Sequence, residues 1–274
     1  MIDFNGTYYT KEELILPWTN SILQNGYSVS SYILMRNSRP LFVEEHYLKI
    51  MAQMRILKMG IPMTYTPELF QGVLLKFCKK LDFNEGVLKL SFFELGSSNE
   101  IAYSIESFKV PESKTVQMDL YNDYYIQEGS HRFVNTHFDR LYELSSRFAK
   151  EQEVDGCFVL NNSKKLADSS MGTLFCIKDQ TVFTPSLASG TRDLVSRIKM
   201  MQWIKSDQKY QLIEEDTTPF ALQKQDAVFL YSFEKGVIPV KQYRKKTYQV
   251  ELCSYFEELA FKNTLNLDGD LQVR

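Results

Sequence analysis

The sequence is poor in residue types that mark particular kinds of protein. It contains only four cysteines and three histidines in 274 residues. The cysteines, Cys78, Cys157, Cys176 and Cys253, are far apart, and no CxxC or histidine-rich spacing is present, so we expect no metal site. Cys157 and Cys176 stand in apolar surroundings, GCFVL and LFCIK, which indicates small buried residues.

No stretch of the chain has the composition of a targeting or membrane-spanning segment. The opening residues, MIDFNGTYYT, include neither a basic nor an apolar segment, and no apolar run approaches the roughly 20 residues that a membrane span needs. A net charge of -2 with a pI near 6.0 gives no general attraction to nucleic acids or anionic membranes. We therefore expect a cytoplasmic protein with neither nucleic acid nor membrane as a partner.

Lysine is missing from the middle of the chain, and glycine is scarce throughout. No lysine occurs between Lys114 and Lys150, a stretch that contains arginines and the segment FVNTHF, residues 133–138. The 12 glycines fall below the average share of about 7%. These two absences exclude lysine chemistry from this stretch and disfavour long glycine-rich loops.

The composition is that of an ordinary globular protein. Apolar residues make up 44% and charged residues 24%, and the length allows one large domain or two small ones. The polar segment 111–114 is typical of a domain boundary. We predict a small N-terminal domain over 1–112 and a larger C-terminal domain over 113–274, with a cleft between them.

Hydrophobic periodicity predicts alternating strands and helices in the first domain. SVSSYILMRN and RPLFVEE are predicted as strands around a turn at Asn37-Ser38, and EEHYLKIMAQMRILKMG as a helix that ends at Gly60. PELFQGVLLKFCKKL is a second predicted helix, and the strands GVLKLSFFEL and EIAYSIESF follow. The predicted buried stripe of the second helix is Leu69, Val73, Phe77 and Leu81.

The second domain is predicted to combine short strands with amphipathic helices. A helix is expected from about Asn135 to Glu151, with Phe138, Leu141, Leu144 and Phe148 on one face. Strands are predicted at GCFVLNN, KLADSS, TLFCIKD, TVFTPSL and AVFLYSF, and helices at TRDLVSRIKMMQWI and YQVELCSYFEELAFK. This order favours an α+β fold of two domains with mixed sheets.

Four segments, in this order, carry a resemblance to a known family. They are RPLFVEEHYLKIMAQMRILKMGIPM, DGCFVLNNSKKLADSSMGTLFCIKDQTVFTPSL, SGTRDLV and QDAVFLYSFEKGVIPV. They resemble the fold-type IV pyridoxal-phosphate enzymes, which include branched-chain and D-amino-acid aminotransferases and aminodeoxychorismate lyases. The resemblance implies the architecture of the D-amino-acid aminotransferases, pyridoxal phosphate as cofactor, and a homodimer.

The resemblance places the family's Schiff-base lysine on a residue that cannot form an imine. Counting back from Asp155 without a gap puts that position at Asn135, so we do not expect covalent attachment of the cofactor. Lys164 and Lys165 precede Asp168 by four and three residues. On an extended strand they would lie roughly 10 Å or more from it, so neither is an obvious substitute.

Other family positions are occupied by altered residues. Asp168 corresponds to the glutamate beside the cofactor's ring nitrogen, although it is equally a candidate for an ordinary aspartate at a turn or strand end. Lys49 corresponds to an arginine that contacts the phosphate, and it keeps the charge but not the bidentate geometry. A solvated surface lysine is the alternative for Lys49.

Two further segments match the family's phosphate-binding positions. Gly190 and Thr191 could offer a hydroxyl and backbone donors to a phosphate, while the alternative is that Thr191 caps a helix. Ser232 matches the second hydroxyl-bearing loop in part. Glu234 would repel a phosphate there unless Lys235 offsets its charge.

Three functional hypotheses follow from these observations. The first is a class IV aminotransferase-like protein that cannot transaminate by the usual Schiff-base mechanism and binds a small phosphorylated or carboxylated molecule, or serves as a dimeric partner. The second is an active aminotransferase or aminodeoxychorismate lyase that holds the cofactor non-covalently or uses another lysine, with His137 as a candidate base. The third is an unrelated α+β binding protein.

Overall fold

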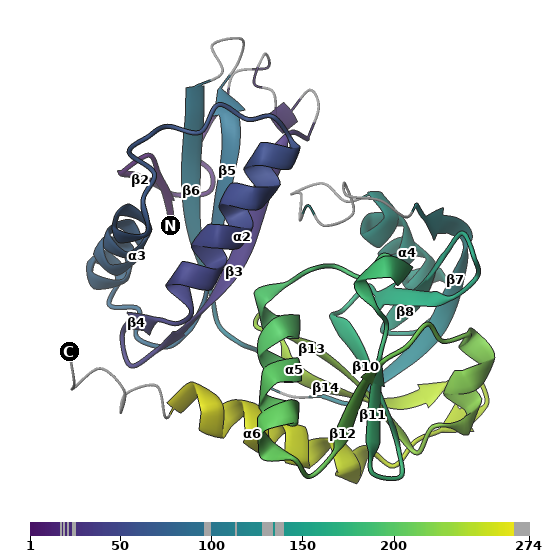
Figure 1. Ribbon diagram of the computed structural model, residues 1–274. Coiled ribbons are helices and arrows are strands. Elements are labelled where there is room, and N and C mark those ends of the chain that lie inside the picture. Colours follow the sequence, from purple (N-terminus) through teal and green to yellow (C-terminus); the bar gives the residue numbers. More distant parts are fainter. Residues whose placement is uncertain are drawn as a thin grey trace. The chain divides into compact units, whose positions relative to one another are not determined.

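The computed structural model describes residues 1–16, 18, 20, 22–23, 26–95, 100–112, 114–127, 134 and 140–265 (Figure 1). Contacts within the chain form two compact units, one built on Met1–Val110 and the other beginning at Pro111. Each unit has its own sheet, and together they give the α+β class with mixed sheets that the sequence predicts. Asn135, His137 and Phe138 lie outside the described residues.

The first unit is a six-stranded antiparallel sheet in the order β2-β1-β6-β5-β3-β4. Two helices, α2 and α3, pack on one face of it, and their apolar side chains form one core with those of β3, β5 and β6. The bounds are β1 Ile2–Phe4, β2 Thr7–Tyr9, β3 Ser28–Arg36, β4 Arg39–Pro40, α2 Val43–Ile56, α3 Pro67–Leu81, β5 Gly86–Leu95 and β6 Glu100–Phe108.

The turn at Asn37-Ser38 is confirmed, but the strand predicted after it is too long. Both turn residues have positive φ, 48° and 62°, which suits a tight hairpin between β3 and β4. β4 stops at Pro40 because Phe42 adopts the left-handed conformation (φ 58°) and α2 begins at Val43. The predicted helix end at Gly60 is also wrong, since α2 ends at Ile56.

Helix α3 has the predicted bounds but buries a different face. Thr66 caps it, accepting a hydrogen bond from the backbone N–H of Leu69, and Pro67 opens it. The buried residues are Phe70, Leu74, Phe77 and Cys78, whereas Leu69 is 37% exposed. Phe70 stacks on Phe92 of β5 with ring centroids 5.0 Å apart, so aromatic packing decides which face is buried.

The second unit is a mixed, nine-stranded sheet in the order β12-β11-β10-β13-β14-β7-β8-β9, with β15 paired to β14. β7 runs parallel to both neighbours, and β11 parallel to β12; the other pairs are antiparallel. The strands are β7 Val116–Ile126, β8 Gly156–Asn161, β9 Leu166–Ser169, β10 Thr173–Lys178, β11 Thr181–Thr184, β12 Gln211–Glu214, β13 Ala227–Ser232, β14 Gly236–Tyr243 and β15 Lys246–Thr247.

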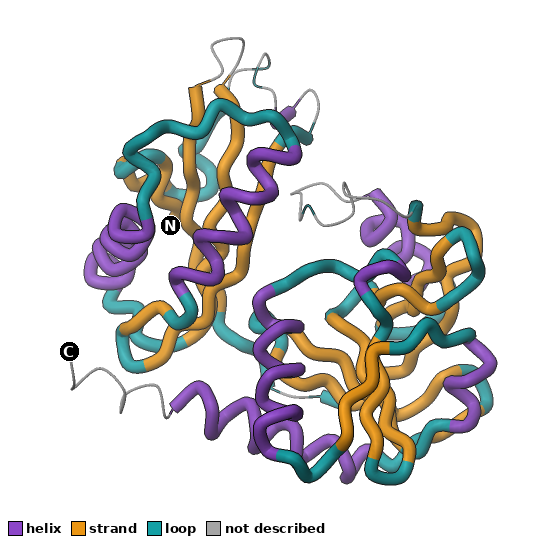
Figure 2. The backbone as a smooth tube through the Cα atoms, viewed as in Figure 1, coloured by secondary structure: helices purple, strands orange, loops and turns teal. Residues whose placement is uncertain are grey.

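The sheet of the second unit curls around one core and carries helices on its outer side (Figure 2). Alternate residues of β7 and β8 point inward to that core or outward to α4, as the period of a strand requires. Phe229 of β13 stacks on Phe256 of α6 at 4.5 Å, and Trp203 of α5 meets Tyr231 edge-on. The helices are α4 Arg140–Glu151, α5 Val195–Asp207 and α6 Ser254–Leu265, with 3-10 turns η3 Leu187–Ser189, η4 Pro219–Lys224 and η5 Val250–Cys253.

Helix boundaries in the second unit differ from the predictions. α5 begins at Val195 with Leu194 as its N-cap, four residues later than predicted, so the N-cap interpretation of Thr191 is wrong. α6 begins at Ser254, after the short turn η5. In α4, Leu141 is buried as predicted, but Leu144 is 45% exposed.

All four cysteines are buried, as predicted. No helix in the described part of the chain is long and apolar enough to cross a membrane. Within those same residues, no group of three or more His, Cys, Asp or Glu side chains could hold a metal ion.

The buried face of α3 gives a test of the fold. Replacing Phe70 by alanine should lower the free energy of unfolding by about 3–5 kcal/mol, because its ring is 1% exposed and stacked on Phe92. The matched control Leu69→Ala should cost less than about 1 kcal/mol. Urea unfolding followed by circular dichroism measures both, and equal losses would contradict the assigned face.

Candidate functional site

The acid at Asp168 lies in a fully buried strand of the second unit. β9 has four residues, all buried, and Asp168 is opposite Val159 of β8. The Asp168 side chain is 0% exposed. A carboxylate in such a place is stable only where hydrogen bonds and an opposite charge replace the water it has lost.

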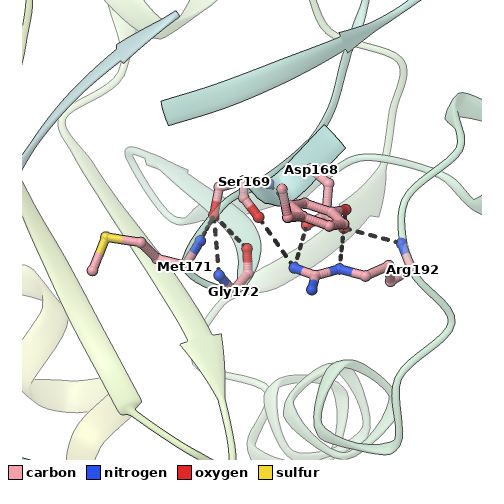
Figure 3. A network of polar contacts seen from close by, with 6 residues as sticks. Asp168, Ser169, Met171, Gly172 and Arg192 are labelled. Atoms are coloured by element: carbon pink, nitrogen blue, oxygen red, sulfur yellow. Dashed lines mark hydrogen bonds and ion pairs between the residues drawn. The ribbon is translucent and has the colours of Figure 1, made fainter. Parts of the chain in front are cut away.

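Asp168 has both replacements, and they occupy its oxygens (Figure 3). The guanidinium of Arg192 donates from Nε to Oδ2 at 2.7 Å, and the Tyr142 hydroxyl donates to the same oxygen at 2.7 Å. The backbone N–H of Arg192 also donates to Oδ2, at 3.2 Å, and that of Ser169 donates to Oδ1 at 2.9 Å. The carboxylate therefore has little acceptor capacity left for another donor.

Arg192 is held as firmly as the acid. Its guanidinium carbon lies 4.0 Å from the centre of the Tyr142 ring, and Nη2 donates to the Ser169 carbonyl at 3.1 Å. Burial disfavours the charged form of Arg192, but Asp168, Tyr142 and Glu234 more than offset this effect and raise its pKa above the ordinary value. Arg192 is thus a fixed, permanent cation with a side chain 18% exposed.

The turn after Asp168 is fixed by the Ser169 hydroxyl (Figure 3). This hydroxyl donates to the Gly172 carbonyl at 2.6 Å and accepts from the backbone N–H groups of Met171 and Gly172 at 3.2 and 3.1 Å. A Cβ at Gly172 would lie 2.9 Å from the Tyr231 carbonyl oxygen, so the turn packs closely against β13. The acid consequently sits on a rigid support.

The segment that carries Thr191 is braced by an aspartate from a distant part of the chain. The carboxylate of Asp216 accepts hydrogen bonds from the hydroxyls of Ser186, at 2.7 Å, and Ser189. These bonds, that from Ser189 first, lower the pKa of Asp216. Gly190 follows with φ 91°, a left-handed conformation that glycine adopts without strain, and turns the chain toward Thr191.

Two buried hydroxyls at predicted phosphate positions have no hydrogen-bond partner among the described residues. They are Thr191 Oγ1, on a residue 0% exposed, and Ser232 Oγ, on a residue 3% exposed. An unpaired buried hydroxyl costs roughly 1–3 kcal/mol, so native proteins seldom keep one without a reason. Both hydroxyls are available to a polar ligand.

Ser232 ends β13 and begins a tight turn that brings two charges toward Arg192. Ser232 pairs with Gly236 of β14, so the turn consists of Phe233, Glu234 and Lys235. Glu234 and Lys235 both lie within electrostatic reach of the Arg192 guanidinium. The structure therefore relates this turn to the loop at Thr191 and Arg192, and through Arg192 to Asp168.

The predicted site residues fall into three groups. Asp168, Gly190, Thr191 and Ser232 all belong to the second unit, on neighbouring strand ends and loops. Lys49 lies half-buried on α2 of the first unit. Asn135 lies outside the described residues, so its assignment to the lysine position stays a prediction.

Sequence reasoning missed two contributors to this site. Arg192 was expected to be an ordinary first-turn residue of a helix, although its position next to Thr191 was a usable signal. Tyr142 lies on α4, 26 residues before Asp168, and nothing in the sequence pattern points to it. Both are positioned by tertiary packing.

The family that the sequence resembles also matches by direct comparison. The model of the amino-transferase class IV family matches residues 31–243, more than half of the chain. The chain belongs to the class IV aminotransferase family. The predicted resemblance is confirmed at this level, and the alternative of an unrelated α+β protein is wrong.

Solved structures of the same fold cover almost the whole chain. The branched-chain amino acid aminotransferase of Escherichia coli has a TM-score of 0.85 at 14% identity, over 95% of this chain and 93% of that one. A 4-amino-4-deoxychorismate lyase assigned in Legionella pneumophila has 0.83 at 15%, over 93% and 97%. A branched-chain amino acid aminotransferase from T.th., complexed with N-(5'-phosphopyridoxyl)-L-glutamate, has 0.84 at 16%, over 95% and 92%. No curated protein matches at a significant level.

The class IV aminotransferase family uses pyridoxal phosphate, and the residues present fit only one end of that cofactor. The hydroxyls of Thr191 and Ser232, with the cation of Arg192, fit its phosphate. The ring-nitrogen end does not fit, because Asp168 already accepts from Arg192, Tyr142 and Ser169. The family's acid position is therefore occupied by a satisfied ion pair.

The ion pair can be tested through stability. Asp168→Ala should lower the free energy of unfolding by about 3–5 kcal/mol, because it leaves the largely buried cation of Arg192 without its partner. The control Glu143→Ala breaks a pair with Arg147 of nearly the same length, 2.8 Å, whose side chains are 65% and 70% exposed, and should cost about 0–1 kcal/mol. Similar losses in urea unfolding would contradict the burial argument.

The unpaired hydroxyl of Thr191 predicts a stability change of opposite sign. Thr191→Val keeps the shape and removes the unsatisfied group, so the ligand-free protein should become more stable by about 1 kcal/mol. The control Thr184→Val removes a hydroxyl that donates to the Leu174 carbonyl at 2.8 Å and should destabilise by about 1 kcal/mol. Thermal unfolding distinguishes the two, and a destabilised Thr191→Val protein would show that the hydroxyl has a partner.

Proposed function

We propose that this class IV aminotransferase-family protein binds a small molecule that carries a phosphate or carboxylate, and does not transaminate by the usual lysine Schiff-base route. The observation that carries the proposal is the pair of buried, unpartnered hydroxyls of Thr191 and Ser232 beside the fixed cation of Arg192. Hydroxyls and a guanidinium are donors that suit an anion.

Arg192 has donors to spare for such a ligand. Its Nε and Nη2 groups bond to Asp168 and Ser169, whereas Nη1 makes no hydrogen bond within the described part of the chain. The anchored guanidinium can therefore receive an anion without losing side-chain freedom on binding. Preorganisation of this kind favours a small anionic ligand over a large flexible one.

Two features support the loss of transamination. The gap-free count from Asp155 assigns the lysine position to Asn135, whose amide cannot form an imine. Pyridoxal phosphate acts as an electron sink when an acid keeps its ring nitrogen protonated, and Asp168 is engaged elsewhere. By resemblance to the family we also propose a homodimer.

The binding proposal is tested by calorimetric titration with pyridoxal phosphate and with pyridoxal, which lacks the phosphate. We expect pyridoxal phosphate to bind at least about tenfold more tightly, inorganic phosphate to compete, and Thr191→Val to weaken binding by about tenfold. The control Thr247→Val alters an exposed threonine of the same unit and should bind as the parent does.

The catalytic half of the proposal needs its own assay. Mixtures of pyridoxal phosphate, amino acids and 2-oxo acids should give no exchange of amino groups above the rate of the free cofactor. Equal affinity for pyridoxal and pyridoxal phosphate would contradict anion binding. Ping-pong turnover in the assay would contradict the loss of transamination and favour the active-enzyme alternative.

A further inference from the structure

Lys235 occupies an unusual position for a lysine. It is the last residue of the three-residue turn between β13 and β14, and it is only partly exposed. The turn is anchored on both sides, because Phe233 and Val237 are 3% and 4% exposed and Phe233 packs edge-on against Tyr231 with ring centroids 6.1 Å apart. The backbone of Lys235 is therefore fixed in place.

The charges around Lys235 come from three directions. Glu234 belongs to the same turn, Arg192 comes from the segment before α5, and Arg192 is itself paired with Asp168 of β9 and stacked on Tyr142. Burial is the main cause that lowers the pKa of Lys235; Arg192 acts in the same direction and Glu234 opposes it. A desolvated lysine beside another cation is the arrangement that favours a neutral, nucleophilic amine.

We propose that Lys235 is a nucleophilic amine that forms an imine with an aldehyde or ketone carrying a phosphate or carboxylate. This proposal rests on the proposed function, because the anion is held by the donors of that site. Ser232 and Lys235 belong to one turn, so the anion anchor and the amine are joined by three residues of chain. A carbonyl compound held by its anionic end is thereby presented to Lys235.

The chemistry balances without a further reactant. The neutral amine of Lys235 adds to the carbonyl carbon to give a carbinolamine, and the amine proton passes to the oxygen through solvent. Loss of that oxygen as water forms the carbon–nitrogen double bond. The step involves no oxidant or reductant, and hydrolysis returns the free lysine.

Borohydride trapping tests the proposal. The protein is incubated with pyridoxal phosphate or pyridoxal as the probe, reduced, and mapped by peptide mass analysis. We expect one modified lysine, Lys235, with yield about tenfold lower from pyridoxal. Lys235→Arg keeps the charge but cannot form an imine, so it should retain reversible binding and lose the adduct. Lys205→Met, an exposed lysine on α5, is the control and should change neither.

A second measurement does not depend on the ligand. Competitive acetylation of the unliganded protein across a range of pH gives the reactivity of each lysine. Because the ammonium must lose a proton before it reacts, the reactivity of Lys235 should rise at lower pH than that of Lys205. Coincident profiles would overturn the proposal.

The outcomes separate this proposal from the proposed function. Tight binding of pyridoxal phosphate with no adduct, or with adducts spread over surface lysines, overturns the role of Lys235 and leaves anion binding intact. An adduct that persists in Lys235→Arg overturns it as well. Absence of pyridoxal phosphate binding would overturn both, because the carbonyl would then have no anchor.

Discussion

The ion pair between Asp168 and Arg192 is the interaction on which the second unit's site depends. A fully buried carboxylate is stable only because a guanidinium, a phenol and two backbone N–H groups surround it. The same pair fixes the loop that carries Thr191 and holds a permanent cation beside the turn at Lys235. One local arrangement therefore orders the strand end, the loop and the electrostatics of the turn. It also takes the acid away from the contact that relatives of the family make with their cofactor's ring.

The site combines satisfied and unsatisfied groups in a way that separates structure from binding. Asp168, Ser169 and Asp216 have their hydrogen bonds, so they hold the backbone in position whether or not a ligand is bound. The hydroxyls of Thr191 and Ser232 have no partner among the described residues, and their desolvation is a standing cost that only a polar ligand would offset. A site of this kind is expected to gain stability when its ligand arrives.

The sequence predicted elements better than it predicted faces and contacts. The bounds of α3 followed from Pro67 and the apolar run behind it, but its buried face followed from a ring that stacks on Phe92, which no periodicity reveals. β7 was missed because its outer residues are polar and its burial depends on two neighbours from distant parts of the chain. The same limit applies to the site. Lys235 read as a counter-charge for Glu234, and only its burial in the folded unit indicates an amine that reacts.

The position of β14 has a consequence for how the second unit is made. β14 lies between β13 and β7, so among the described strands the ladders β12-β11-β10-β13 and β7-β8-β9 join only through Gly236–Tyr243. During synthesis the two ladders must wait for this late strand, each with a bare edge that can pair with another chain. The strand that closes the sheet also positions the turn of the candidate site, so the site can form only after nearly all of the unit has left the ribosome.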